Sequence, residues 1–219
     1  IDLTVLAFDL AEKYRTLVFV LADGAIGQMM EPAELPPMRD LPTRRPGWAL
    51  TGANGRAPNV ISSIKMGAQT NEAYNMHLQA KLREIEQAGE LRYEAYQLLD
   101  AEVAIVAFGT ASRVAQSALN TLRESGAKVG LFRPITLWPF PEEQLFELAQ
   151  QVDVFLVVEM NAGQMLHDVR EAVAGKAPVK FYGRMGGATP SPAEIVAEVR
   201  KMVTDLPGRN SEGSNGHHS

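Results

Sequence analysis

Three turns of the chain carry polar side chains that could bind an anion or contact another protein. The stretch GTASR at 109–113 combines a glycine with two hydroxyl groups, and EMNAGQM at 159–165 supplies a carboxylate and two amides. The third, GRMGGATPSP at 183–192, is rich in glycine. Each turn follows an apolar run and precedes a helical pattern, and in open parallel sheets ligands bind where strands end and helices begin. These turns are therefore the first candidates for a binding site.

Ordinary helix capping explains most of their polar residues. GTASR lacks the full G-x-G-x-x-G spacing of a dinucleotide-binding loop, so capping is a simpler interpretation than an anion cradle. Asn161 and Gln164 stand three residues apart, as an N-cap and its reciprocal capping-box partner do. Gly163 would allow another chain or a ligand to approach closely. Capping does not explain the carboxylate of Glu159, which stands where a strand is expected to end.

Other catalytic patterns are absent from the sequence. It contains no Walker A motif, no G-x-S-x-G, no H-E-x-x-H and no cluster with metal-ligand spacing. His77 and His167 fall on separate predicted helices, and each is interpreted as a surface residue. The chain has no cysteine, which excludes disulfides, thiolate catalysis and protein-ligated iron–sulfur clusters on this polypeptide.

Composition narrows the class of protein further. The 219 residues are 46% hydrophobic and 21% charged, which suits one large domain or two small ones. A net charge of −5 without a basic cluster argues against nucleic-acid binding. No apolar run reaches the ~20 residues that span a bilayer, and no signal-peptide pattern opens the chain. We expect a cytoplasmic protein that does not enter the membrane.

The elements that must position the three turns alternate regularly from residue 101. Apolar runs within EVAIVAFGT, AKVGLFR, VDVFLVVEM and PVKFYG are typical of strands that are buried on both faces, and an amphipathic helical pattern follows each one. Four successive strand–helix units predict an α/β domain over 101–205, with an open, mostly parallel sheet and helices on both faces. Residues 206–219 are expected to form a disordered tail.

Residues 1–35 are interpreted as the end of a different domain. A helical pattern at the start is followed by an apolar run from Leu17 to Ala22 that predicts a buried parallel strand, ended by Asp23 and Gly24. One helix cannot cover such a strand on both faces, so we expect the first part of this domain to lie outside the chain. The alternative is that the strand joins the downstream sheet.

Residues 36–100 are expected to be a linker with a long helix at about 71–88, for which Gly89 is a natural C-cap. Prolines and glycines between 36 and 58 rule out long regular elements there. Four arginines fall in the same stretch: Arg39, Arg44, Arg45 and Arg56. A phosphate site is one interpretation, but arginines spread over a loop are more often solvated or paired with carboxylates.

The stretch LFRPITLWPFP at 131–141 is interpreted as a stiff connector. A strand is expected to end near Arg133, and Pro141 fits the first position of the next helix. The prolines leave Trp138 and Phe140 unexplained. Large aromatics on a rigid turn suit a contact between domains or subunits, whereas the alternative is that both residues cap the domain core.

The same turns, taken in order, resemble one family. They are LADGAIGQMMEP at 21–32, FGTASR at 108–113, LFRPITLWPFP at 131–141 and VVEMNAGQMLHDVR at 157–170. Over about residues 1–205 the chain is similar to the α subunit of 2-oxoacid:ferredoxin oxidoreductases, and most to the 2-ketoisovalerate (3-methyl-2-oxobutanoate) branch. The stretch LTGANGRAPN at 50–59 lacks the His-Asp-Glu of the TGxEHDE motif found in 2-oxoglutarate relatives. The resemblance makes residues 1–35 the end of a thiamine-pyrimidine-type domain and 101–205 a transketolase C-terminal-like domain.

The resemblance implies a multi-subunit enzyme. Family members decarboxylate a 2-oxoacid oxidatively on thiamine diphosphate, form an acyl-CoA from coenzyme A and pass electrons through [4Fe–4S] clusters to ferredoxin. A β subunit holds most of the thiamine diphosphate and its Mg²⁺, and γ and δ ferredoxin-like subunits carry clusters. The family's activating glutamate and substrate-contacting Thr/Arg stretch have no counterpart in this sequence. No catalytic or metal-binding residue is therefore assigned, and the isolated chain is expected to be inactive.

Two sets of site residues follow as expectations. Those nearest the cofactor are Asp23, Gly24, Gln28 and Met29, because they follow a strand end in the pyrimidine-type domain. Those at subunit or domain interfaces are Arg133, Trp138, Phe140, Glu159, Asn161 and Gln164. Two alternatives remain: a free-standing α/β binding or interaction module with a small ligand at GTASR, and the α subunit of a pyruvate- or 2-oxoglutarate-specific relative.

Overall fold

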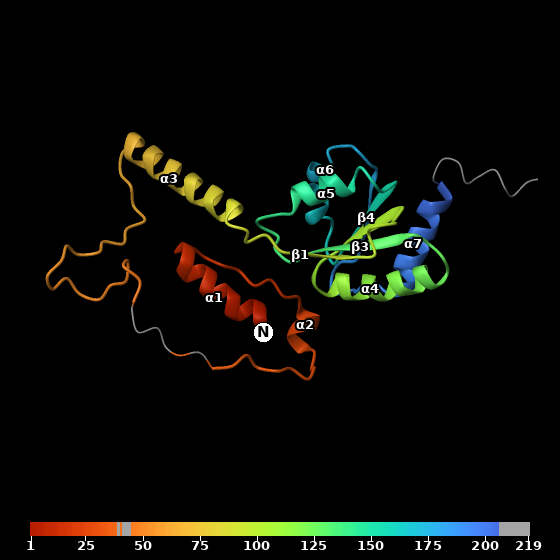
Figure 1. The fold of residues 1–219 in the computed structure, drawn as a ribbon, viewed down its shortest axis with the longest axis horizontal. Coiled ribbons are helices and arrows are strands. Elements are labelled where there is room, and N and C mark those ends of the chain that lie inside the picture. The colour runs from red at the N-terminus through yellow and green to blue at the C-terminus, as the bar shows by residue number, and fades with distance from the viewer. Residues whose placement is uncertain (39, 41–44, 206–219) are drawn as a thin grey trace, which may run out of the picture. The chain divides into compact units, whose positions relative to one another are not determined.

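The computed structural model describes residues 1–38, 40 and 45–205 in two compact units. Residues 1–20 and 30–88 form a helical unit, and residues 21–29 together with the chain from 89 onward form a sheet unit (Figure 1). The expected tail at 206–219, and two of the four loop arginines, Arg39 and Arg44, lie outside the described residues.

The sheet unit confirms the predicted α/β class. Its strands are β1 (Tyr93–Tyr96), β2 (Val103–Val106), β3 (Val129–Pro134), β4 (Val154–Glu159) and β5 (Val179–Gly183). Its helices are α2 (Gly24–Gln28), α4 (Gly109–Glu124), α5 (Glu142–Leu148), α6 (Met165–Val173) and α7 (Pro192–Asp205). The strand order is β1-β3-β2-β4-β5, in which β2 to β5 pair in parallel and β1 runs antiparallel to β3.

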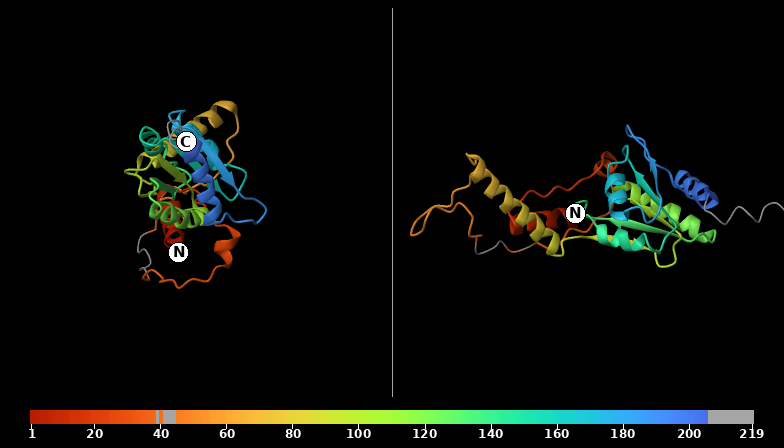
Figure 2. Two further views of the ribbon diagram at one scale, coloured as in Figure 1. Left: turned by 90° about the vertical axis from the view of Figure 1, so that its right-hand side faces the viewer. Right: turned by 90° about the horizontal axis from the view of Figure 1, so that it is seen from above.

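The sheet lies between two layers of helices, because its central strands are apolar on both faces. Alternate residues of β2 point to opposite faces. Val103 and Ile105 pack with α4 and α7, whereas Ala104 and Val106 pack with α5 and α6. Figures 1 and 2 show the two helix pairs on opposite sides of the sheet. Every residue of β2 and β4 is buried, which explains why their sequences show no polar alternation.

The edge strand β1 was not expected and falls within the predicted linker. Ala95 pairs with Phe132 of β3, and the rings of Tyr93 and Phe132 stack with centroids 5.0 Å apart. The ion pair between Glu94 and Arg133 joins the same two strands at 2.8 Å. The four residues of β1 alternate between exposed and half-buried, as in an edge strand with one covered face.

The helical unit contains α1 (Asp2–Tyr14) and α3 (Ala68–Gln87), and α3 begins three residues before the expected helix. Lys81 on α3 donates a hydrogen bond to the carbonyl of Arg15, 3.0 Å away, just after α1 ends. Among the described residues of this unit, Tyr14 and Ile85 are the buried hydrophobic side chains. Two helices with so small a core cannot be stable alone.

The predicted strand at Leu17–Ala22 is not a strand in the structure. Residues 17–22 carry no strand pairing, and the described sheet ends at β1 on one side and β5 on the other. The alternative, that this segment joins the downstream sheet, is therefore wrong as well. Leu17 and Phe19 are 81% and 77% exposed. An apolar run forms a strand only where a neighbouring strand can satisfy its backbone groups, and the described residues provide none.

Candidate functional site

The parallel strands define one crevice at the carboxyl edge of the sheet. From β2 the chain moves to β3 on one side, whereas β4 and then β5 lie on the other side of β2. The helices that follow β2 and β4 therefore diverge to opposite faces of the sheet, and a crevice opens between the two strand ends. In open α/β sheets this switch point is where ligands bind.

A cavity of about 200 Å³ lies at this switch point. Residues of three segments line it, around α2, at the start of α4 and at the end of β4: Leu21, Ala22, Asp23, Ile26, Phe108, Gly109, Ala111, Glu159, Met160 and Asn161. Two of the turns singled out from the sequence thus meet at one place, together with the segment that contains Asp23. The third turn, 183–192, contributes none of the lining residues.

Asp23 lies at the beginnings of two helices, α2 and α4. It is the N-cap of α2, where its carboxylate accepts a hydrogen bond of 2.9 Å from the backbone N–H of Ile26. Burial alone would raise the pKa of Asp23. The hydroxyl of Thr110 and the backbone N–H groups of Ile26, Ala25 and Thr110 outweigh burial and hold that pKa below its ordinary value. Asp23 therefore joins α2 to the N-terminus of α4.

The other three residues expected near a cofactor lie along the same short segment. Gly24 and Gln28 are exposed on α2. Met29 follows α2, and its sulfur accepts a hydrogen bond of 3.4 Å from the guanidinium of Arg113 on α4. The four expected residues thus lie within one short segment, residues 23–29, and of the four only Asp23 lines the cavity.

Glu159 is the fully buried acid of the site, with 0% exposure. Its Oε1 accepts a hydrogen bond from the N–H of Leu166, and its Oε2 accepts from Met165 N–H, each at 3.0 Å. The side-chain amide of Asn161 donates to Oε2 at 2.9 Å. A carboxylate at the N-terminus of α6 is favoured by the helix dipole. The side chain of Glu159 is directed at the start of α6, and its expected place at an interface stays a prediction.

The expected capping box at Asn161 and Gln164 does not form in full. Gln164 is itself the N-cap of α6 and makes no side-chain capping bond. Asn161 instead closes the turn before the helix, since its Oδ1 accepts from Gly163 N–H at 2.7 Å and Gln164 N–H at 3.0 Å. The group that approaches Gly163 closely belongs to the chain itself, because an added Cβ at Gly163 would lie 3.3 Å from the ring of Phe181. Gln164 is exposed and remains a candidate for an interface.

In the 131–141 stretch the two aromatics have different surroundings. Phe140 packs against the core between the sheet and helices α5 and α6, whereas Trp138 is 50% exposed. Arg133 at the end of β3 binds Glu94 in the edge-strand ion pair, and this carboxyl also accepts from the hydroxyl of Tyr96. The Tyr96 hydroxyl and then Arg133 hold the pKa of Glu94 below its ordinary value. Pro141 is the N-cap of α5, whereas the sequence predicted it as the first residue of the helix.

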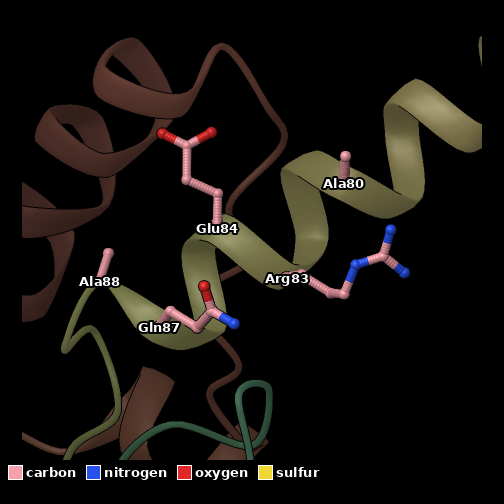
Figure 3. A pocket seen from close by; sticks show the side chains of 5 residues that line it. All are labelled: Ala80, Arg83, Glu84, Gln87 and Ala88. Carbon is pink, nitrogen blue, oxygen red and sulfur yellow. The ribbon is translucent and has the colours of Figure 1, made fainter.

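A second depression, of about 470 Å³, lies on the helical unit along the end of α3. It is lined by Ala80, Arg83, Glu84, Gln87 and Ala88 (Figure 3). The charged ends of Arg83 and Glu84 point away from each other in Figure 3. Binding sites combine an apolar pocket with convergent polar groups, and this open surface of one helix has neither.

The described residues also limit what else the chain could bind. Within 1–38, 40 and 45–205 no group of three or more histidine, aspartate or glutamate side chains could hold a metal ion. Over the same residues no helix is both long and apolar enough to cross a membrane.

Comparison with known proteins identifies relatives over most of the chain. The model of the pyruvate:ferredoxin oxidoreductase core domain II matches residues 101–195. The chain is 42% identical over 202 residues to the ketoisovalerate oxidoreductase subunit VorB of Methanothermobacter marburgensis, and the match covers 92% of this chain and 57% of that subunit. It is 29% identical over 228 residues to the 2-oxoglutarate synthase subunit KorA of Methanothermobacter thermautotrophicus, covering 92% of this chain and 60% of that subunit.

The chain thus spans less than two thirds of the length of these curated relatives. Among solved structures, a 2-oxoglutarate:ferredoxin oxidoreductase from Magnetococcus marinus, with 2-oxoglutarate, coenzyme A and succinyl-CoA bound, superposes with a TM-score of 0.55. The sequence identity is 24%, over 63% of this chain and 24% of that one. At this identity the superposition supports the fold alone.

Proposed function

We propose that this chain, which belongs to the 2-oxoacid:ferredoxin oxidoreductase family, is part of the α subunit of a cytoplasmic, thiamine-diphosphate-dependent enzyme. The complex would convert a 2-oxoacid and coenzyme A to an acyl-CoA and CO2, with ferredoxin as the electron acceptor. The preferred substrate would be 3-methyl-2-oxobutanoate. The observation that carries this choice is the identity of 42% to a ketoisovalerate oxidoreductase subunit, against 29% to a 2-oxoglutarate synthase subunit.

The cofactors would be held by other parts of the complex. The sequence has no cysteine to bind an iron–sulfur cluster. We assign both metal groups to partners: a thiamine-binding β subunit and ferredoxin-like γ and δ subunits. The share of this chain is to shape the edge of the site with the segment 21–29 and to hold the subunits together.

Exposed apolar surface supports this assembly role. The largest share of the exposed large hydrophobic side chains lies in the helical unit, which buries only Tyr14 and Ile85 among its described hydrophobic residues. Surfaces of this kind mark protein–protein contacts. We propose that residues 1–35 complete a pyrimidine-type domain, in which Leu17–Ala22 becomes a strand, that 36–100 link it to the next domain, and that 101–205 form the transketolase C-terminal-like domain.

Size-exclusion chromatography tests the assembly. The chain is expected to co-elute with the thiamine-binding subunit, and Trp138→Ala is expected to weaken that association roughly 30-fold, as loss of an interface tryptophan typically does. Because Trp138 is half exposed, the melting temperature should change by no more than about 2 °C.

Phe146→Ala provides the matched control, because Phe146 is another exposed aromatic of the sheet unit, on α5. This variant should co-elute as the unchanged chain does. A large fall in melting temperature for Trp138→Ala would instead assign Trp138 to the core. A chain that stays monomeric beside the thiamine-binding subunit would favour the free-standing binding module.

A further inference from the structure

The N-terminus of α4 lacks the groups that normally neutralise a helix start. Its N-cap is Phe108, which makes no side-chain capping bond, and its first turn contains no acidic residue. The first four N–H groups of a helix have no partners within the helix, and together they act as a partial positive charge. With 16 residues, α4 is long enough for this effect to develop fully.

A buried hydroxyl stands at the same place. Thr110 is 7% exposed, and its Oγ1 makes no hydrogen bond of normal geometry with any described residue. An unbonded hydroxyl at such burial is costly unless a polar group faces it. The carboxyl of Asp23 is the nearby polar group, because Asp23 lines the same cavity as Gly109 and Ala111 at this end of α4, and Thr110 lowers the pKa of Asp23.

Asp23 belongs to a short segment whose neighbours in the sequence lie in the other unit. Residues 21–29 belong to the sheet unit, although the residues on either side of them, 1–20 and 30–88, belong to the helical unit. The segment meets α4 at both ends: Asp23 lines one cavity with Gly109 and Ala111, and Met29 accepts a hydrogen bond from Arg113. Residues 110 and 113 are three apart and so lie on one face of α4.

We infer that the N-terminus of α4 is a carboxylate-binding site, and that this chain fills it with the side chain of its own Asp23. The site consists of the first backbone N–H groups of α4 and the hydroxyl of Thr110. Asp23 is then a positioning residue, which fixes α2 over the crevice. The carboxylate site depends only on contacts within the sheet unit, so its test is independent of the proposed enzyme activity.

Chemical rescue tests the site. In Asp23→Ala, acetate is expected to bind in place of the missing side chain and to shift the backbone amide resonances of Thr110 and Ala111 in a saturable way. The unchanged chain, whose site is filled, should show no such shift. Acetamide, which has the shape of acetate without its charge, and sodium chloride at equal ionic strength are the controls for shape and ionic strength.

Two further variants keep the test decisive. Asp23→Ser retains an N-cap for α2 but leaves the α4 site empty, so it should also bind acetate even if the alanine variant is poorly folded. Adding Thr110→Val should weaken acetate binding about tenfold, because one charge-assisted hydrogen bond is lost, whereas Thr110→Ser should preserve binding.

Release of the segment gives a second readout. In Asp23→Ala, hydrogen exchange of the amides of residues 24–28 should be about tenfold faster than in the unchanged chain, since the cap of α2 and the contact with α4 are both lost. The carboxylate site is refuted if acetate fails to shift Thr110 and Ala111 in both Asp23 variants. Equal shifts in the unchanged chain, or equal shifts with acetamide, would refute it too.

Discussion

Replacing Glu159 by alanine is expected to lower the free energy of unfolding of the sheet unit by about 3–5 kcal/mol, since three donors lose their acceptor and each unsatisfied buried donor costs about 1–3 kcal/mol. Glu159 is 0% exposed, and three donors depend on it: the N–H groups of Met165 and Leu166 and the amide of Asn161. Without the carboxylate these donors remain buried and unpaired, and each loses a hydrogen bond to a charged acceptor.

Urea unfolding, followed by far-UV circular dichroism, measures this effect. Glu171→Ala is the matched control, because it removes an exposed glutamate from the same helix and should change stability by less than about 0.5 kcal/mol. Glu159→Gln should also destabilise the protein, since the new amide group would direct N–H donors at N–H donors. If Glu159→Ala is as stable as the control, Glu159 does not hold the start of α6.

Replacing Phe19 by aspartate is expected to weaken assembly with the thiamine-binding subunit roughly 100-fold or more. Phe19 is 77% exposed, so the chain alone should lose no stability. The proposed function makes residues 17–22 a strand that is buried in the complete subunit. There an unpaired aspartate would cost on the order of 3 kcal/mol or more, which corresponds to that loss of affinity.

Isothermal titration of the chain against the thiamine-binding subunit measures this affinity. The control is Leu99→Asp, which places the same charge at a 97% exposed leucine outside the proposed strand. Leu99→Asp should bind as the unchanged chain does. Equal affinity of Phe19→Asp and the unchanged chain would contradict the proposal that residues 17–22 become a buried strand.

The parallel sheet could be predicted from the sequence because each strand and the helix that follows it show a pattern within their own residues. Each of β2 to β5 is preceded or followed by a clear helical pattern. The continuous apolar runs of β2 and β4 indicate that helices cover both faces of these strands. The strand β1 gives no such signal. It has four residues with alternating exposure, and it exists because β3 lies beside it, about 36 residues further along the chain.

Residues 17–22 show the opposite case, in which an apolar run predicts a strand that the structure does not contain. Their apolar run resembles that of β2, yet they form no strand in the structure. Hydrophobicity indicates that a segment favours burial, but the pairing partner is a property of the surrounding structure. A strand can therefore be predicted correctly only together with its neighbour.

The candidate site was predictable in position but not in detail. Turns after strand ends mark the crevice, and two of them, with Asp23, line its cavity. The sequence does not reveal that the side chain of Glu159, at the end of β4, binds the start of the next helix, α6, since the capping-box pattern of Asn161 and Gln164 is equally compatible with a local cap. Nor does it reveal that Asp23 acts on Thr110, a contact between residues far apart in the chain.

The turn before α7 carries a clear capping signal in the sequence. Ser191 precedes α7 and Glu194 follows three residues later, which is the spacing of a capping box. In the structure Glu194 accepts from the N–H of Ser191 at 2.7 Å, and Ser191 accepts from the N–H of Glu194 at 3.3 Å. This cap explains the order of the turn at 183–192 without any ligand.

Reduction of ferredoxin tests the central claim most directly. The complex that contains this α subunit, supplied with thiamine diphosphate and coenzyme A, should reduce ferredoxin with 3-methyl-2-oxobutanoate at a kcat/KM at least about tenfold above that with 2-oxoglutarate or pyruvate, as expected when a pocket discriminates by a side chain's size or charge. The 219-residue chain alone should show no turnover. Preference for 2-oxoglutarate or pyruvate would contradict the proposed substrate, and turnover by the chain alone would contradict the assembly.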